Sequence, residues 1–72
     1  GPMEGTVIVQ AIVDTLGKVE RPSIKVISSP DPAFSASVVS MIRQTRFIPA
    51  RVNGRARRVM IQIPVVFTLT HH

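Results

Sequence analysis

Few side chains in this sequence are able to do chemistry, and most of those are arginines. The segment from Arg46 to Arg58, RFIPARVNGRARR, holds five arginines and no acid, and Arg43 lies just upstream of it. The chain of 72 residues carries nine Lys and Arg against four Asp and Glu, a formal net charge of +5. Such asymmetry is typical of proteins with an anionic partner, but an ordinary solvated surface produces the same composition.

Catalytic chemistry has little support in the residue types present. An active site needs titratable groups that converge, whereas most of the acids have structural explanations at a turn, on a strand surface or at a helix cap. The chain has no cysteine, so neither a disulfide nor a cysteine-based metal site is expected. We therefore predict a binding module, not an enzyme, with no cofactor and no metal. The acids and histidines considered are Glu4, Asp14, Glu20, Asp31, His71 and His72.

Two strands are predicted in the first part of the chain. The segment from Thr6 to Val13 is β-branched and apolar on both faces, which is typical of a central strand. A hairpin connection follows from Asp14 to Lys18, where Gly17 is free to take a positive φ. A second strand is predicted from Val19 to Ser28. Its Pro22 cannot donate a ladder hydrogen bond, which favours a sheet edge or a bulge.

An amphipathic helix is predicted from about Pro32 to Gln44. Asp31 suits the N-cap position, and proline is favoured in the first turn because its missing N–H would be unpaired there anyway. Apolar side chains then recur at helical spacing, and we expect this whole stripe to pack in the core. The stripe consists of Phe34, Val38, Met41, Ile42 and Thr45.

A long final strand is predicted from Arg57 to Thr70. Asn53-Gly54 is a strong tight-turn signal, and it connects a short arm, from about Ile48 to Val52, to this strand. Apolar positions alternate along the strand with positions that hold both polar and apolar residues. One face of the strand should therefore pack against the core, and the other should be largely solvated.

The predicted fold class is α+β with the order β-β-α-β. The strands form a three-stranded antiparallel sheet in the order second-first-last, and one helix packs on one face. The strands that contain Pro22 and Pro64 are assigned to the edges. The domain is expected over residues 4–70, after a segment (1–3) typical of a cleaved tag and before a two-residue tail (71–72). The predicted core residues are Phe34, Val38, Ile42, Phe47, Ile61, Ile63 and Phe67.

Two kinds of binding are compatible with these residues. Arginines clustered around a hairpin tip would suit nucleic acid and would give salt-sensitive affinity. However, the chain has three phenylalanines, no tyrosine and no tryptophan, and all three phenylalanines have the phase of core residues. No aromatic side chain is left to stack on bases, so we do not expect nucleic acid as the partner.

The alternative is that the last strand binds an extended peptide along its free edge. If Pro64 directs its nitrogen outward, the even-numbered residues offer their backbone groups to the peptide. An edge strand that is only protected by proline and nearby charge has the same pattern, so the residues alone leave both explanations open. The predicted docking residues are Arg58, Val59, Met60, Ile61, Gln62, Ile63, Val66 and Thr68. Arginines upstream would steer an acidic peptide toward the edge, namely Arg51, Arg55 and Arg57.

Four segments in this order resemble the C-terminal domain of TonB-family energy transducers. They are EGTVIVQAIVDTLGKV, SSPDPAFSASVVSMIR, RFIPARVNG and VMIQIPVVF, and the resemblance extends from Glu4 to about Leu69. The most specific part runs from Arg46 through Ala50, followed by Asn53-Gly54 and the strand that ends in Phe67.

The resemblance implies a periplasmic domain of a protein anchored in the inner membrane by a segment outside this chain. Such proteins couple the proton-motive force to outer-membrane transporters for chelated iron and similar cargo. The family docks the TonB box of these TonB-dependent receptors as an added strand beside the last strand, and an inner-membrane proton-channel complex energises it. Related domains also occur fused to membrane sensor peptidases. Two unguarded strand edges in so short a chain would also permit a strand-exchanged homodimer.

Overall fold

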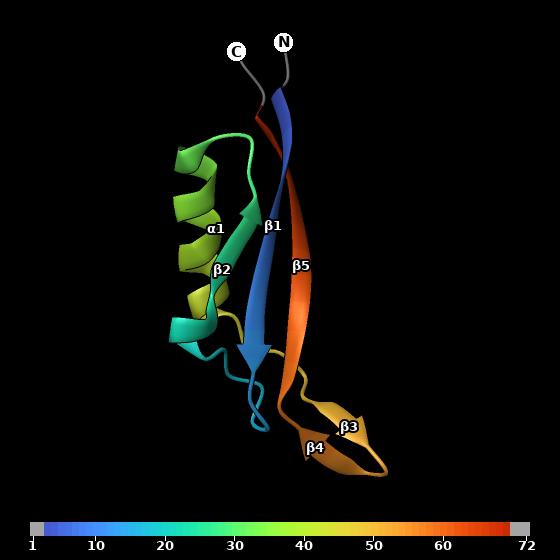
Figure 1. Cartoon of the computed structure of the whole chain (residues 1–72). Helices are drawn as coiled ribbons and strands as arrows, with labels where there is room; N and C mark the ends of the chain where they lie inside the picture. Colours follow the sequence, from blue (N-terminus) through green and yellow to red (C-terminus); the bar gives the residue numbers. More distant parts are fainter. Residues whose placement is uncertain (1–2, 70–72) are drawn as a thin grey trace.

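The computed structural model describes residues 3–69 of the chain. Strands β2, β1 and β5 form an antiparallel sheet in that order, and β3 and β4 form a separate two-stranded hairpin. Figure 1 shows helix α1 along one side of the sheet and the hairpin beyond the beginning of β5. The predicted fold class and strand order are confirmed. The elements are β1 (Met3–Val13), the short 3-10 helix η1 (Arg21–Ser23), β2 (Lys25–Ser28), α1 (Pro32–Gln44), β3 (Ala50–Val52), β4 (Arg55–Arg57) and β5 (Val59–Leu69).

Strand β1 is central, and its odd-numbered side chains form the sheet's contribution to the core. Side chains alternate between the two faces of a strand, and one face of β1 is buried, in part beneath α1. Val38 and Ile42 of the helix are buried against it. Phe34, Phe47, Ile63 and Phe67 are partly buried and pack around this cluster, whereas the partly buried Ile61 is not among the side chains that do so. The buried residues of β1 are Val7, Val9, Ala11 and Val13.

The first and last strands pair along their whole length. The register runs from Met3 opposite Leu69 to Val13 opposite Val59 without a shift. Both strands differ from the predicted bounds. The first begins earlier, at Met3, and the predicted last strand is divided because Arg57 ends β4 and β5 begins at Val59. The chain turns out of the hairpin and into the sheet between them, and the predicted end at Thr70 lies outside the described residues.

The prediction of one continuous strand from Val19 to Ser28 is wrong. Val19 makes an isolated bridge to Val13, η1 then interrupts the strand, and pairing resumes only with β2. Pro22 lies in the first turn of η1, where no ladder hydrogen bond is required of it. Ser23 takes the place of a paired strand residue there, because its Oγ accepts from the Ile12 N–H at 2.8 Å and donates to the Glu20 carbonyl at 2.5 Å.

Helix α1 has the predicted bounds and the predicted cap. The Asp31 side chain accepts a hydrogen bond from the Ala33 N–H at 2.8 Å. The expectation that Met41 packs in the core is wrong, since its side chain is 48 % exposed. It lines an open groove between the helix and β5. At the start of the helix, the rings of Phe34 and Phe67 meet edge to face with centroids 4.0 Å apart.

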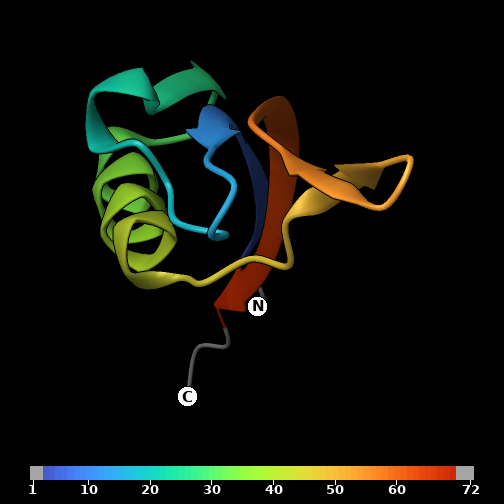
Figure 2. The ribbon, with the colours of Figure 1, turned by 90° about the horizontal axis from the view of Figure 1, so that it is seen from below.

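The connection from α1 to β3, residues 45–49, crosses one end of the sheet (Figure 2). It is held there by the turn after β1, because the Phe47 N–H donates to the Gly17 carbonyl at 2.9 Å. Gly17 has the predicted positive φ, 85°. A side chain at this position would not fit, since a Cβ would lie 1.9 Å from the Phe47 carbonyl oxygen.

Candidate functional site

The outer edge of β5 is the longest unpaired strand edge in the described part of the chain. β5 has 11 residues and pairs only with β1, so no strand of residues 3–69 occupies its other side. Figure 1 shows no chain segment beside this edge along most of its length. An edge of this kind presents a row of unpaired N–H and C=O groups, which is the surface that an additional strand requires.

Pro64 lies in the middle of this edge strand. It stands opposite Ile8, and the register on both sides of it continues without a bulge. A proline has no N–H to donate to a neighbouring strand. Prolines in sheets are therefore found where the nitrogen faces the unpaired side of an edge strand.

Apolar surface flanks the free edge on both faces of the sheet. On the helix side, an open groove of about 430 Å³ runs between α1 and β5. On the opposite face, Met60 is 62 % exposed and Val66 is 70 % exposed, and Pro64 lies exposed between them. A strand added at this edge would meet apolar side chains above and below it. The groove is lined by Ala33, Phe34, Ser37, Val38, Met41, Val65 and Phe67.

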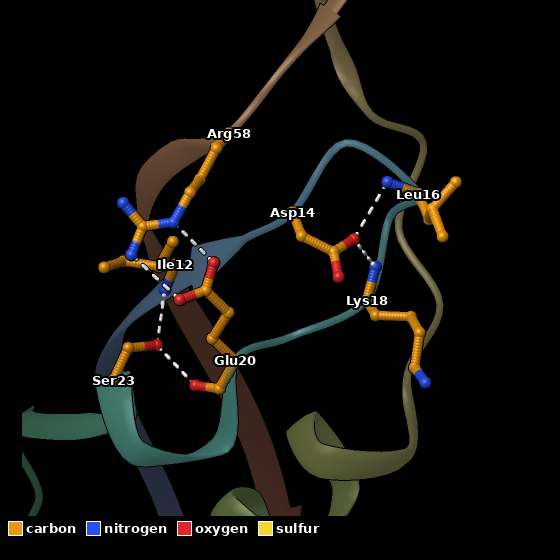
Figure 3. A network of polar contacts seen from close by, with 7 residues as sticks. All are labelled: Ile12, Asp14, Leu16, Lys18, Glu20, Ser23 and Arg58. Atoms are coloured by element: carbon orange, nitrogen blue, oxygen red, sulfur yellow. Dashed lines mark hydrogen bonds and ion pairs between the residues drawn. The ribbon is translucent and has the colours of Figure 1, made fainter.

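The structure places all but one of the predicted docking residues on β5. Arg58 is the exception, because it lies between β4 and β5 and its side chain is already paired (Figure 3). Its guanidinium group makes a two-point contact with the Glu20 carboxylate, at 2.5 Å from Nε and 2.8 Å from Nη2. The hydrogen bond from Arg58 holds the pKa of Glu20 below its usual value. Arg58 therefore connects the start of β5 to the residues before η1. The residues on β5 are Val59, Met60, Ile61, Gln62, Ile63, Val66 and Thr68.

The three arginines predicted to steer a partner lie on the β3–β4 hairpin. Arg51, Arg55 and Arg57 are all exposed, and Arg51 donates from Nη1 to the Gly54 carbonyl at 3.0 Å. Asn53 and Gly54 both have positive φ, 52° and 77°, which agrees with the tight turn predicted for this dipeptide. The hairpin projects beside the beginning of β5 (Figure 2), so its positive charge lies at one end of the free edge.

Sequence patterns did not indicate the polar network at this end of the molecule. In Figure 3, Asp14 caps the turn after β1, and its Oδ1 accepts from the N–H groups of Lys18 and Leu16, both at 2.9 Å. The hydrogen bond from Lys18 is the main reason that the pKa of Asp14 is lowered. The short spacing from Asp14 to Lys18 is a local signal for such a cap. The Glu20–Arg58 pair, 38 residues apart, has no local signal at all.

The described residues show neither a metal centre nor a membrane helix. Among residues 3–69, no three His, Cys, Asp or Glu side chains gather as metal ligands would. Within the same part of the chain, no helix combines the length and the apolar character needed to cross a bilayer.

Comparison with known proteins identifies the family. No curated protein and no solved structure gives a significant match to the chain. The family described as Gram-negative bacterial TonB protein C-terminal matches residues 2–69, which is nearly the whole sequence. Its members are periplasmic protein-interaction domains of TonB proteins, which interact with outer-membrane receptors, and the family is not one of enzymes. The chain belongs to the TonB C-terminal domain family.

Proposed function

We propose that this domain docks the TonB box of an outer-membrane TonB-dependent transporter by adding it as a strand along the free edge of β5. The observation that carries the proposal is the edge itself, 11 residues long and without a strand beside it in the described chain. Strand addition supplies affinity through main-chain hydrogen bonds and specificity through alternate side chains. Membership of the TonB family supports this choice of partner.

The unbroken register around Pro64 supports an orientation for the backbone of β5. Because Pro64 fits an edge strand when its nitrogen faces outward, residues of the same parity direct their N–H and C=O groups outward with it. Gln62 and Val66 then offer complete pairs of donors and acceptors to the incoming strand, and so do Met60 and Thr68. At Pro64 only the carbonyl is available, so the partner strand can donate a hydrogen bond there but finds no N–H to accept from.

Charge at the hairpin suits a TonB box that contains an acidic residue. Arg55 and Arg57 are exposed and make no ion pair within residues 3–69, where the only such pair is Arg58 with Glu20. Complementary charge of this kind raises the association rate more than the affinity. We expect the acidic end of the bound segment to lie near Val59.

In this proposal the domain is the periplasmic end of a protein anchored in the inner membrane. An inner-membrane proton-channel complex would energise it through parts of the protein outside this chain, and the docked transporter would carry chelated iron or similar cargo. The domain contributes the grip on the transporter. The same edge would also accept β5 of a second copy, and light scattering across a concentration series would detect that homodimer.

An amide chemical-shift titration with a peptide of TonB-box type tests the docking. We expect the largest shifts along β5, and we expect them to persist in about 0.3 M salt, where charge steering is largely screened. Shifts confined to the hairpin and abolished by salt would contradict strand addition.

Gln62→Pro sharpens the test, because it removes one outward N–H and leaves the β1–β5 ladder intact. The variant should remain folded and bind the peptide roughly two- to tenfold more weakly, the net worth of one hydrogen bond. Gln62→Ala keeps the N–H and is the matched control. If Gln62→Pro unfolded the domain, the N–H would have to point toward β1, and the proposed orientation would be wrong.

A further inference from the structure

We infer that a basic cleft between the end of α1 and the loop after β1 binds a phosphate group. The cleft has a volume of about 430 Å³. None of its lining residues belongs to β5, and it plays no part in the docking of a strand at the β5 edge. The inference does not rest on the proposed function.

Four cations from separate segments line this cleft. Lys18 comes from the turn after β1 and Arg21 from η1. Arg43 lies in the last turn of α1, and Arg46 follows the helix. All four side chains are exposed, and the lining contains no acid. Within residues 3–69 the only ion pair joins Arg58 to Glu20, so none of the four has a carboxylate partner there.

The negative charges near the cleft are too few to neutralise it. The C-terminal end of a helix carries about half a negative charge, which Arg43 partly balances. Asp14 is close enough for the charges of Lys18 and Arg46 to contribute to its lowered pKa, after the larger effect of the Lys18 backbone N–H. Its Oδ1 is engaged by two backbone N–H groups, and Figure 3 shows the Lys18 side chain extending away from the carboxylate. Four positive charges therefore face one carboxylate and a fractional dipole charge.

Phosphate is the chemistry that best fits such a lining. Guanidinium groups bind phosphate oxygens through two parallel hydrogen bonds, and lysine adds a point charge. The volume falls within the range of small-molecule sites, about 300–1,000 Å³, so it can hold a phosphate together with a small organic group. A soluble phosphorylated compound and the head group of an anionic lipid both present this chemistry.

The distribution of charge over the molecule agrees with an anionic ligand at this end. The β3–β4 hairpin, which carries three more exposed arginines, lies beyond the same end of the sheet (Figure 1). These arginines stand on a separate pair of strands and are absent from the cleft lining. This separation makes it possible to distinguish a shaped site from general attraction by charge.

The test is an amide chemical-shift titration with inorganic phosphate, followed by binding to vesicles. The vesicles contain equal parts of phosphatidylcholine and phosphatidylglycerol, with phosphatidylcholine alone as the reference. We expect phosphate to shift residues 18, 21 and 43–46. The variant Arg21→Gln/Arg43→Gln should weaken phosphate binding and should weaken vesicle binding about fivefold for each cation removed. The matched variant Arg55→Gln/Arg57→Gln removes the same charge from the hairpin and should bind phosphate like the parent.

The outcomes separate the sources of phosphate and the competing explanations. Phosphate shifts without vesicle binding support a soluble ligand, whereas vesicle binding that requires Arg21 and Arg43 supports a lipid head group. Equal losses in the two double variants would reduce the effect to net charge and would overturn the cleft as a site. A phosphate titration that leaves residues 18, 21 and 43–46 unshifted would also overturn it. All four substituted arginines are exposed, so both variants should remain folded.

Discussion

Residues 3–69 contain two glycine turns with positive φ, and they relate to the rest of the fold in opposite ways. Gly17, in the turn after β1, has a φ of 85° and faces the Phe47 carbonyl at a distance that leaves no room for a side chain. Gly54, at the tip of the hairpin, has a φ of 77° and has nothing within 4 Å of the place a Cβ would take. The first turn is tied to the chain after α1, and the second projects into solvent.

This difference shows that a turn signal in a sequence predicts local conformation but not tertiary contact. The backbone at Gly17 needs glycine for its φ and also for the close approach of another segment, which is 30 residues away by number, at Phe47. The backbone at Gly54 needs glycine for its φ alone. The first turn fixes where the second half of the chain crosses the sheet, while the second turn serves only its own hairpin.

Substitution of Gly17 by alanine should have the largest effect on stability. The left-handed conformation costs a residue with a Cβ about 1–2 kcal/mol, and the Phe47 segment must also move. We expect a total loss of at least about 3 kcal/mol in the free energy of unfolding, measured by urea denaturation. A loss below about 1 kcal/mol would mean that the two segments are not in contact.

Phe47→Ala keeps the backbone contact with Gly17 and removes the side chain that packs against the core. Full truncation of a buried phenylalanine costs about 3–5 kcal/mol, and Phe47 is partly exposed, so we expect a loss of about 2–3 kcal/mol. Ile48→Ala is the matched control because Ile48 is 94 % exposed, and its effect should stay within about 0.5 kcal/mol. Equal urea midpoints for the two variants would refute the role assigned to Phe47.

Gly54→Ala tests the open turn. Only the positive φ opposes this substitution, so we expect a loss of about 1 kcal/mol, clearly smaller than that of Gly17→Ala. The amide spectrum should change in the hairpin and remain as in the parent in the sheet. A loss as large as that of Gly17→Ala would remove the distinction between the two turns.

Glu20→Gln should have the smallest effect, and the effect should depend on pH. The pKa of Glu20 is lowered in the folded domain, first by its hydrogen bond from Arg58, so its contribution to stability is present above the pKa of the unfolded chain. That contribution is lost as the pH falls through the folded pKa. Thermal melts of parent and variant should therefore differ at neutral pH and converge in acid. Glu4→Gln removes the same charge and is the matched control for net charge.

The parts of the fold that the sequence predicted well are those with local signals. Asp31 and Pro32 mark the beginning of α1 within two residues, and the helix has the predicted bounds. Asn53-Gly54 specified its turn in the same way. The position of β1 in the sheet followed from its apolar residues on both faces, and Pro64 assigned β5 to an edge, which is where the structure has it.

The parts that were mispredicted depend on contacts between distant segments. Pro22 is compatible with an edge strand and with a 3-10 turn. The 3-10 turn is favoured by the hydrogen bond that the Ile12 N–H donates to the Ser23 hydroxyl, which no local pattern indicates. Periodicity placed Met41 on the core stripe of the helix, but it cannot show that this part of the stripe borders an open groove. Similarly, nothing near Arg58 in the sequence indicates that its side chain pairs with Glu20 instead of joining the neighbouring arginines on the hairpin.

The complete antiparallel pairing of β1 with β5 has a mechanical consequence. Met3 and Leu69 stand opposite each other, so a load applied between these two residues would open the ladder one pair at a time. If Met3 is held fixed and a force pulls on β5 in the direction of Val59, the force runs parallel to the strands. The whole ladder of hydrogen bonds then shares it. The direction of pull therefore determines whether the same set of hydrogen bonds peels apart in sequence or resists in shear.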